Sequence, residues 1–290
     1  MDAKKFSKCA LCGSNDWLRE SHIIPSFVSK KIKANSPTGG LRFQRNPNKR
    51  EQDGDKINLL CESCEQRFSK VEKKFSEEVL KPYHENSQTS FEYGEWLSRF
   101  ICSVNWRTLY LDIIGFRSQG NIPDGALDIL SEAEKILSDF LLGKRDDIAT
   151  LENHIIPMFE IQQTNSEIKE PNFLLRTGVL DYTMFDSELN TCCTCANLAG
   201  ILIFTIIRRG KNDIWENTIV NLAGGKINQP PVNVSSPIAN DIIKTLKGVS
   251  FDTISENQKN KILQRLKDNP KAKDSKAVQY REMDKRIKRT

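Results

Sequence analysis

The sequence has no long hydrophobic run. Its longest apolar stretch covers about residues 198–207, and Gly200 and Thr205 interrupt it. About ten residues is half of what a membrane-spanning helix needs. The N-terminal residues 1–6 also lack the apolar core of a signal peptide. These two absences predict a soluble, cytoplasmic protein with no membrane partner.

Compositional bias is absent as well. Of the 290 residues, 38% are hydrophobic, 8% are aromatic and 28% are charged, which is ordinary for a globular protein. This composition excludes a collagenous repeat, a low-complexity chain and disorder over the full length. The length allows roughly two domains, each with its own core.

The net charge of +5 is small, but the positive charge lies at the two ends. Residues 1–50 carry 11 Lys and Arg against 3 Asp and Glu, and residues 259–290 carry 12 against 4. The middle of the chain is acidic. Basic ends of this kind favour contact with a polyanion such as nucleic acid. The alternative is that the last stretch is only a solvated helix or tail.

Eight cysteines in a cytoplasmic chain argue against a disulfide framework. Four of them form two pairs of identical spacing, Cys9-x2-Cys12 and Cys61-x2-Cys64. Each pair can offer two thiolates to one metal, and two pairs complete a tetrahedral site with Zn–S bonds of about 2.3 Å. The spacing therefore predicts a structural Zn2+. The alternative is four unliganded thiols.

An insertion of 48 residues separates the two cysteine pairs. It contains residues 21–25 (Ser-His-Ile-Ile-Pro), which we interpret as a strand ending at Pro25 that carries one of only three histidines. Turns are expected at residues 36–40 and 52–55, where Asp53-Gly54 is a hairpin signal. Apolar residues at helical spacing after Cys64 predict a helix that Pro82 ends.

With these two motifs, the histidine on a strand and the second cysteine pair leading into a helix, residues 6–85 resemble the HNH endonuclease superfamily. The resemblance implies a ββα-metal core with a treble-clef zinc site. By this resemblance His22 is the general base that activates water, and Asn58 orients it. Glu65, directly after the second cysteine pair, would bind a catalytic Mg2+ or Mn2+, assisted by Glu20 or Glu72.

The chain departs from the family pattern at several positions. Ser21 stands where the family often has a metal-binding Asp, Glu65 stands where His or Asn is usual, and Asn58 lies nearer to Cys61 than the middle Asn usually does. A carboxylate suits Mg2+ or Mn2+ well. The alternative is that Glu65 and Glu72 belong to an exposed helix face, in a zinc module that does not cleave.

Basic residues in the long insertion could follow phosphates by charge alone. These residues are Arg42, Arg45, Lys49 and Arg50. They fit a nuclease and a nucleic-acid-binding module equally well.

The remaining chain carries less information about function. We expect an α+β protein with a zinc-binding ββα domain over residues 1–90, a helical segment over 91–145, a mixed α+β domain over 146–254 and a basic helical tail over 255–290. The part of this tail after Pro270 is expected to be helical only on a partner. Short strands are predicted at residues 155–161, 173–180, 200–207 and 218–222. The cluster Cys192-Cys193-Thr194-Cys195 would need a further ligand such as His154 to bind a second metal; the alternative is a loop with free thiols.

The sequence therefore predicts a metal-dependent HNH-like endonuclease that hydrolyses DNA phosphodiesters, with RNA left open as a substrate. The setting that the resemblance implies is bacterial defence against phage or other foreign DNA. The alternative is a non-catalytic treble-clef zinc module that binds nucleic acid or a protein. A homo-oligomer and a protein partner encoded in the same operon are both left open.

Overall fold

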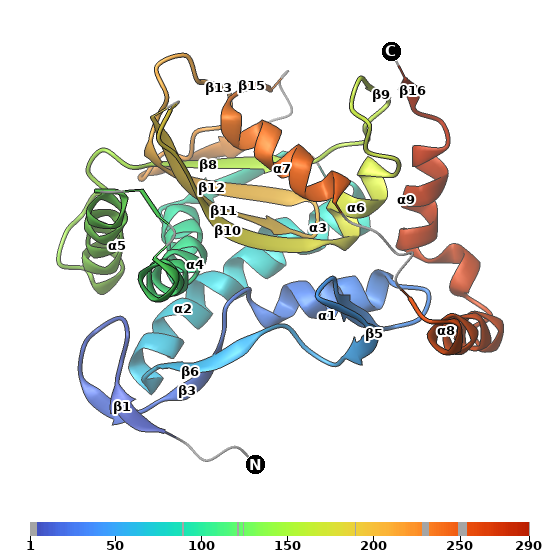
Figure 1. The fold of residues 1–290 in the computed structure, drawn as a ribbon, viewed down its shortest axis with the longest axis horizontal. Helices are drawn as coiled ribbons and strands as arrows, with labels where there is room; N and C mark the ends of the chain where they lie inside the picture. The colour runs from blue at the N-terminus through green and yellow to red at the C-terminus, as the bar shows by residue number, and fades with distance from the viewer. Residues whose placement is uncertain are drawn as a thin grey trace.

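The computed structural model describes residues 5–88, 90–120, 122–123, 125–188, 190–227, 232–248 and 254–289. It has an α+β fold, as predicted from the sequence (Figure 1). A four-stranded sheet forms the centre, and an N-terminal module with the cysteine pairs lies beside it.

The N-terminal module consists of three short antiparallel strand pairs and three helices. The pairs are β1 (Phe6–Lys8) with β2 (Asn15–Trp17), β3 (Arg19–His22) with β6 (Lys56–Leu60), and β4 (Leu41–Phe43) with β5 (Asn46–Glu51). The helices are α1 (Ser26–Asn35), α2 (Glu62–Phe75) and α3 (Lys81–Asn86), and a π-helical turn (Ser76–Leu80) joins the last two.

Several local predictions for this module are wrong. The predicted strand ends at His22, and Pro25 immediately precedes α1, so the insertion is a helix and a hairpin rather than a long loop. Asp53-Gly54 does not join paired strands, because β5 pairs with β4 and β6 pairs with β3. Pro82 lies in the first turn of α3, where a missing N–H is tolerated, and the helical path continues past it.

The central sheet has the strand order β10-β11-β12-β8, and all its pairs are antiparallel. These strands are β8 (Glu152–Pro157), β10 (Val179–Asp186), β11 (Thr191–Leu198) and β12 (Ile201–Arg208). Helix α4 (Trp96–Gln119) covers one face and packs against α5 (Ala126–Leu142), and α7 (Pro237–Lys247) covers the other face (Figure 1). The helices predicted within residues 91–143 are thus present.

Alternation along β11 explains the second cysteine cluster. Cys192 packs with Trp106 on the α4 side, whereas Cys193 and Cys195 pack with Ile238 of α7 on the other side. Successive side chains of a strand point to opposite faces, so these three thiols do not converge. The cluster is a buried strand and not the predicted loop.

Two further strand predictions in this region are wrong. Residues 171–177 form α6 (Pro171–Thr177), and Ile219 makes only an isolated bridge to His154. The minor strand pairs are β7 (Phe91–Gly94) with β14 (Gly224–Ile227), β13 (Ile214–Glu216) with β15 (Asn233–Ser235), and β9 (Gln163–Thr164) with β16 (Lys288–Arg289).

The basic tail is folded onto the rest of the protein. It forms α8 (Glu256–Asp268), a 3-10 turn (Ala272–Asp274), α9 (Lys276–Asp284) and β16. Tyr280 is buried, and the Asp284 carboxylate accepts hydrogen bonds from the backbone N–H groups of Asn172 (2.8 Å) and Phe173 (2.9 Å) at the start of α6. The chain's own α6 thus serves as the surface on which this tail is ordered.

Candidate functional site

The two cysteine pairs meet at one end of the N-terminal module. The ligand atoms of Cys9, Cys12, Cys61 and Cys64 all lie within 4.8 Å of one another. The Sγ atoms of Cys12 and Cys61 are 3.7 Å apart. A zinc tetrahedron with bonds of about 2.3 Å has S···S edges of about 3.8 Å, so this cluster could hold a metal ion such as zinc.

Local structure places each thiol. The first pair lies in the turn after β1, where Gly13 has φ +77° and its N–H donates to Cys9 O (2.9 Å). Cys61 precedes α2 and Cys64 lies in its first turn. The N-terminal end of a helix favours thiolate over thiol. The turn after β1 and the start of α2 therefore bring the two cysteine pairs together across the insertion.

The four thiols differ in acidity. Burial raises the pKa of Cys9 and of Cys64. Burial also acts to raise the pKa of Cys12, but hydrogen bonds from Ser14 outweigh it and lower that pKa to about 6. At Cys61 burial also acts to raise the pKa, but hydrogen bonds, including one with the Ser63 hydroxyl, outweigh it and lower the pKa. A bound cation would favour the thiolate at all four positions.

His22 lies at the end of β3 and forms a pair with a carboxylate. Its Nε2 is 2.8 Å from Asp53 Oδ2, and the two side chains are 23% and 39% exposed. Burial alone would raise the pKa of Asp53, but hydrogen bonds from His22 and the Gly54 N–H outweigh it and lower the pKa. The ring is therefore half-buried, oriented by a carboxylate and open to solvent on one side.

Arg107 of α4 joins β3 to α2. It is 2% exposed, and it donates to the backbone oxygen of His22 (2.7 Å), to Ser103 O (3.0 Å) and to Glu72 Oε1 (2.6 Å). Its bonds fix the backbone of the histidine relative to α2.

Each predicted acidic metal ligand has another side chain as partner. Glu72 pairs with Arg107, Glu20 pairs with Lys56 (2.7 Å), and Glu65 accepts a hydrogen bond from the Ser21 hydroxyl. Ser21 is buried and faces α2, whereas His22 is one residue further along the strand and points to the other face. In the part of the chain that the structure describes, only the four cysteines form a group of three or more metal-ligand side chains.

The described partner of the His22 ring is Asp53, and the orienting role of Asn58 stays a prediction. Asn58 lies on β6 opposite Glu20 in the strand register. The carboxylate of Asp53 was missed as a site residue because its only sequence signal was the turn-forming Asp-Gly pair. A polar loop residue facing a strand-end histidine is the signal that could have found it.

The basic residues of the insertion have mixed partners. Arg45 binds Asp55 with two hydrogen bonds (2.6 and 3.0 Å), and Lys49 pairs with Glu51 (2.8 Å). Arg42 donates to Pro47 O (2.8 Å) and to Gln258 of α8 (3.2 Å), and Arg50 donates to Gly39 O (2.8 Å). Arg42 and Arg50 therefore keep their charge unneutralised by a described carboxylate.

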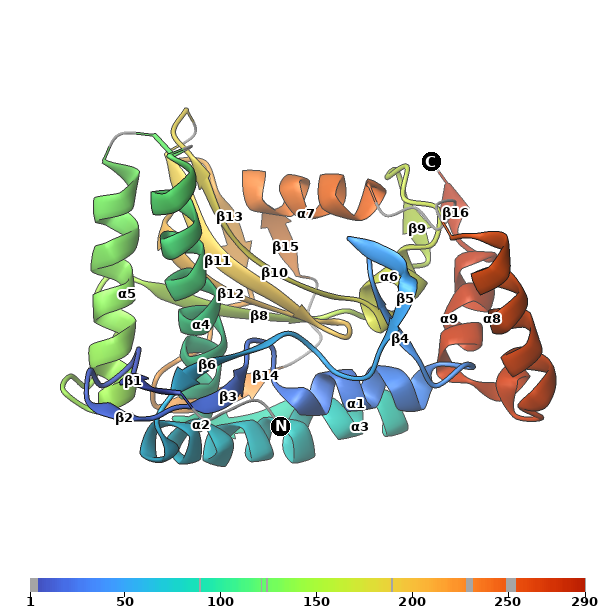
Figure 2. The same ribbon diagram turned by 60° about the horizontal axis from the view of Figure 1, so that its bottom comes forward.

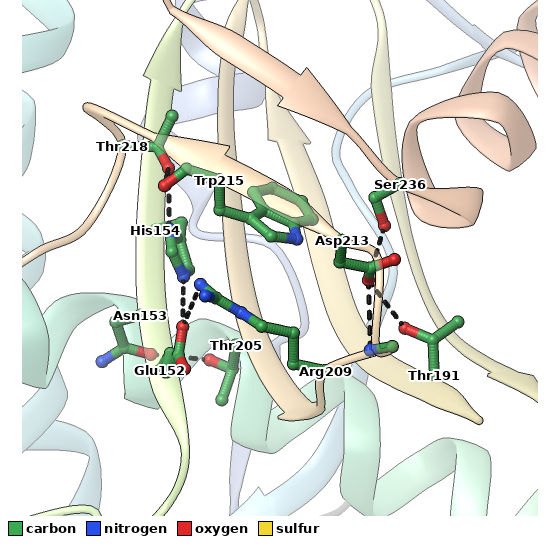
Figure 3. Close-up of polar contacts among 11 residues, drawn as sticks. Glu152, Asn153, His154, Thr191, Thr205, Arg209, Asp213, Trp215, Thr218 and Ser236 are labelled. Atoms are coloured by element: carbon green, nitrogen blue, oxygen red, sulfur yellow. Dashed lines mark hydrogen bonds and ion pairs between the residues drawn. The ribbon is translucent and has the colours of Figure 1, made fainter. Parts of the chain in front are cut away.

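The third histidine, His154, lies in the central sheet, and the described partners of its two ring nitrogens are Thr218 and Glu152 (Figure 3). Its Nδ1 is 2.7 Å from Thr218 Oγ1, and its Nε2 is 3.1 Å from Glu152 Oε2. Arg209 also donates to Glu152 (2.6 Å). His154 is fully buried, so this pair joins the sheet to residue 218 and is not a second metal site.

Comparison with known protein families, with curated proteins and with solved structures found no match to this chain. Over the described ranges, no helix is both long enough and apolar enough to cross a bilayer. The evidence about function therefore comes from the site itself.

Proposed function

We propose that this protein is a metal-dependent, HNH-like endonuclease that hydrolyses DNA phosphodiesters. The observation that carries the proposal is the 2.8 Å contact between His22 and Asp53 at the open end of β3. A histidine that accepts a proton from water needs a defined tautomer and orientation, and a carboxylate on the opposite ring nitrogen is the usual device. An imidazole turned so that its second nitrogen faces solvent would then serve as the base.

The surroundings of His22 support this role. The strands β3 and β6 and the helix α2 form a strand–strand–helix unit, with the cysteine cluster where α2 begins and the histidine at the far end of β3. The buried Arg107 fixes the backbone at His22. A rigid base, held by a carboxylate and a buried guanidinium, can take the water proton without rearranging the fold.

A catalytic Mg2+ or Mn2+ would be held by Glu65, with the Ser21 hydroxyl beside it. Mg2+ is commonly bound by one or two carboxylates, its remaining ligands being water and substrate phosphates. When bound, the ion would stabilise negative charge on the leaving oxygen. The chain's own residues would supply the proton acceptor and, through Arg42 and Arg50, charge that attracts the phosphate backbone.

The second candidate is a zinc module that binds nucleic acid or a protein without cleaving it. The partners of Glu20, Glu65 and Glu72 favour this alternative, because each acidic group already has a hydrogen-bond donor. Such a module would bind DNA in a salt-dependent way that does not need His22.

The test is a plasmid-cleavage assay with Mg2+ or Mn2+ that compares the wild type with His22→Ala, Asp53→Asn and Glu65→Gln. Glu62→Gln is the matched control, because Glu62 is exposed on the same helix and its partner is Arg19. If the protein is an endonuclease, His22→Ala and Asp53→Asn should each lower the cleavage rate at least about a hundredfold. Glu62→Gln should keep the wild-type cleavage rate. Equal cleavage by wild type and His22→Ala, or DNA binding without cleavage in either metal, would contradict the proposal.

A further inference from the structure

A large cavity lies between the insertion, the edge of the central sheet and the C-terminal helices. Its volume is about 1030 Å3. The surrounding elements (α1, β4, β5, β10, α6, α7, α8 and α9) can be followed in Figure 2. This volume is at the upper end of the range for small-molecule sites, roughly 300–1,000 Å3.

One wall of the cavity carries three arginines that have no carboxylate partner among the residues described. They are Arg42 of β4, Arg50 of β5 and Arg265 of α8. Burial, followed by the charges of Arg265 and Arg50, lowers the pKa of Arg42, so the three guanidiniums face the same space. The Nε of Arg50 is buried without a hydrogen-bond partner. Like charges that converge without a counter-ion destabilise a fold, and an anion between them would relieve the repulsion.

The same cavity also has an acidic wall. Asp181 of β10 accepts a hydrogen bond from the Thr108 hydroxyl (3.1 Å), and Asp112 of α4 accepts one from the Thr183 N–H (2.7 Å). Burial, with a contribution from Asp112, raises the pKa of Asp181 to about 6. Carboxylates with unfilled acceptor positions in a partly buried wall suit a ligand that donates N–H groups.

Apolar side chains separate these two polar walls. Among them are Leu41, Leu180, Ile262 and Val278, and apolar atoms form most of the cavity lining. A ligand that fits must therefore carry a multiply charged anion at one end, N–H donors at the other, and an apolar or flat body between them. An inorganic ion would meet only the arginine wall.

We propose that this cavity binds a nucleotide, with its phosphate between Arg42, Arg50 and Arg265 and the N–H groups of its base toward Asp112 and Asp181. Guanidiniums in fork geometry are the preferred partners of phosphate. His22 and Asp53 do not line the cavity, although their neighbours Ile23 and Gly54 do, and the test variant is at Arg265, which has no role in the proposed cleavage. Nucleotide binding can therefore be measured whether or not the protein cleaves DNA.

The experiment is isothermal titration calorimetry of the full-length protein with AMP, GMP, CMP and UMP in turn. Inorganic phosphate and the corresponding nucleosides serve as comparison ligands. The test variant is Arg265→Gln, because Arg265 makes no ion pair in the described fold and its loss removes no such contact. Lys267→Gln is the matched control on the same helix, since Lys267 does not line the cavity.

At least one monophosphate is expected to bind with a Kd below about 100 μM, and Arg265→Gln is expected to weaken it at least about tenfold, or ~1.4 kcal/mol. Lys267→Gln should change the Kd less than about twofold. Asp181→Asn should shift the preference among the four bases. Phosphate and nucleosides alone should each bind at least about tenfold more weakly than the nucleotide.

Three results would overturn the proposal. The first is no saturable binding of any of the four monophosphates at about 5 mM. The second is an equal loss of affinity in Lys267→Gln and Arg265→Gln, which would indicate only general surface charge. The third is inorganic phosphate binding as tightly as the nucleotides, which would show that the rest of the cavity takes no part. A thermal melt of each variant checks that the fold is retained.

Discussion

Two histidine–carboxylate pairs occur among the described residues, and they differ in burial and in the partner of the second ring nitrogen. His22 and Asp53 are 2.8 Å apart, and His154 and Glu152 are 3.1 Å apart. The His22 side chain is 23% exposed at the end of a strand, whereas His154 is fully buried within the sheet. A short contact between a histidine and an acid is therefore no evidence of catalysis by itself.

The second ring nitrogen distinguishes the two pairs. In His154 it is bonded to Thr218, so both nitrogens are occupied within the protein (Figure 3). In His22 the one described partner of the ring is Asp53, and the backbone oxygen of the residue is held from behind by Arg107. The His22 pair is thus partly exposed and has one described ring contact, whereas the His154 pair fixes the position of residue 218.

The largest expected difference between the pairs is their dependence on metal. If the four cysteines hold zinc, replacing Cys61 by Ser should abolish zinc binding and unfold the N-terminal module around His22, because structural zinc supplies an apparent ~10–16 kcal/mol to small zinc modules. The sheet around His154 should stay folded. Metal content by mass spectrometry and hydrogen exchange of the two regions measure these effects.

Cys193→Ala is the control, because this thiol is buried in the sheet away from the four-cysteine cluster. It should keep one zinc per chain. Full retention of zinc by Cys61→Ser would disprove the four-thiol site.

The next effect concerns the support behind His22. Arg107→Met should destabilise the protein by about 3–5 kcal/mol, because it leaves Glu72 partly buried without its partner and frees the His22 backbone oxygen. Urea unfolding gives the free-energy change. Arg117→Met, on an exposed part of the same helix where the arginine bonds Ser131, should cost less than about 1 kcal/mol. Equal costs for the two variants would refute the supporting role of Arg107.

Direct replacement of the two histidines should change the folding free energy by different amounts. His154→Ala should cost about 2–4 kcal/mol of folding free energy, because it opens a buried cavity and removes the hydrogen bonds of the ring to Thr218 and Glu152. His22→Ala should cost less than about 1 kcal/mol, since the side chain is half-exposed. Denaturant unfolding of both variants tests the comparison, and the reverse order would contradict it.

The smallest expected effect is on the pH dependence of stability. Burial lowers the pKa of His154 below its ordinary value, and burial lowers that of His84 to about 3. The unfolded chain therefore takes up these protons first as the pH falls below about 6.5, and the folded state loses up to ~1.4 kcal/mol per pH unit for each histidine. The loss begins near the ordinary pKa of histidine and continues down to the folded-state pKa.

The measurement is the free energy of unfolding at pH 7.5 and 5.5 for the wild type, His154→Gln and His84→Gln. Each variant should lose less stability on acidification than the wild type does. A wild-type-sized loss in both variants would show that other groups cause the acid sensitivity.

The spacing of neighbouring residues was enough to predict the cysteine pairs and the helix that follows them. The two Cys-x2-Cys pairs came together because each pair occupies one turn, and the helix after Cys64 followed its apolar periodicity. The α+β fold class was also confirmed. The turn of each cysteine pair and the helix need only a few neighbouring residues to be specified, whereas the meeting of the two pairs across 48 residues was predicted from the four ligands that zinc requires.

Contacts between distant residues were not predictable in this way. Asp53 meets His22 across 31 residues, and Arg107 reaches the backbone of His22 across 85. The strand predicted at residues 173–180 is largely a helix because Asp284, 112 residues further on, caps its first turn. Tertiary partners here override the β-rich composition of the segment. The roles of Glu20, Glu65, Glu72 and Asn58 stay predictions.

The cap that Asp284 provides has a consequence for how the protein is made. A ribosome adds about 5–20 residues per second, so α6 leaves it roughly 5–20 s before its own capping carboxylate is synthesised. The insertion hairpin also waits, since Asn48 accepts from the backbone of Ser255 207 residues later. A premature stop codon at or before position 284 would remove this cap, and one at or before position 255 would also remove the partner of Asn48. Quality-control proteases would then meet an exposed helix start instead of a closed surface.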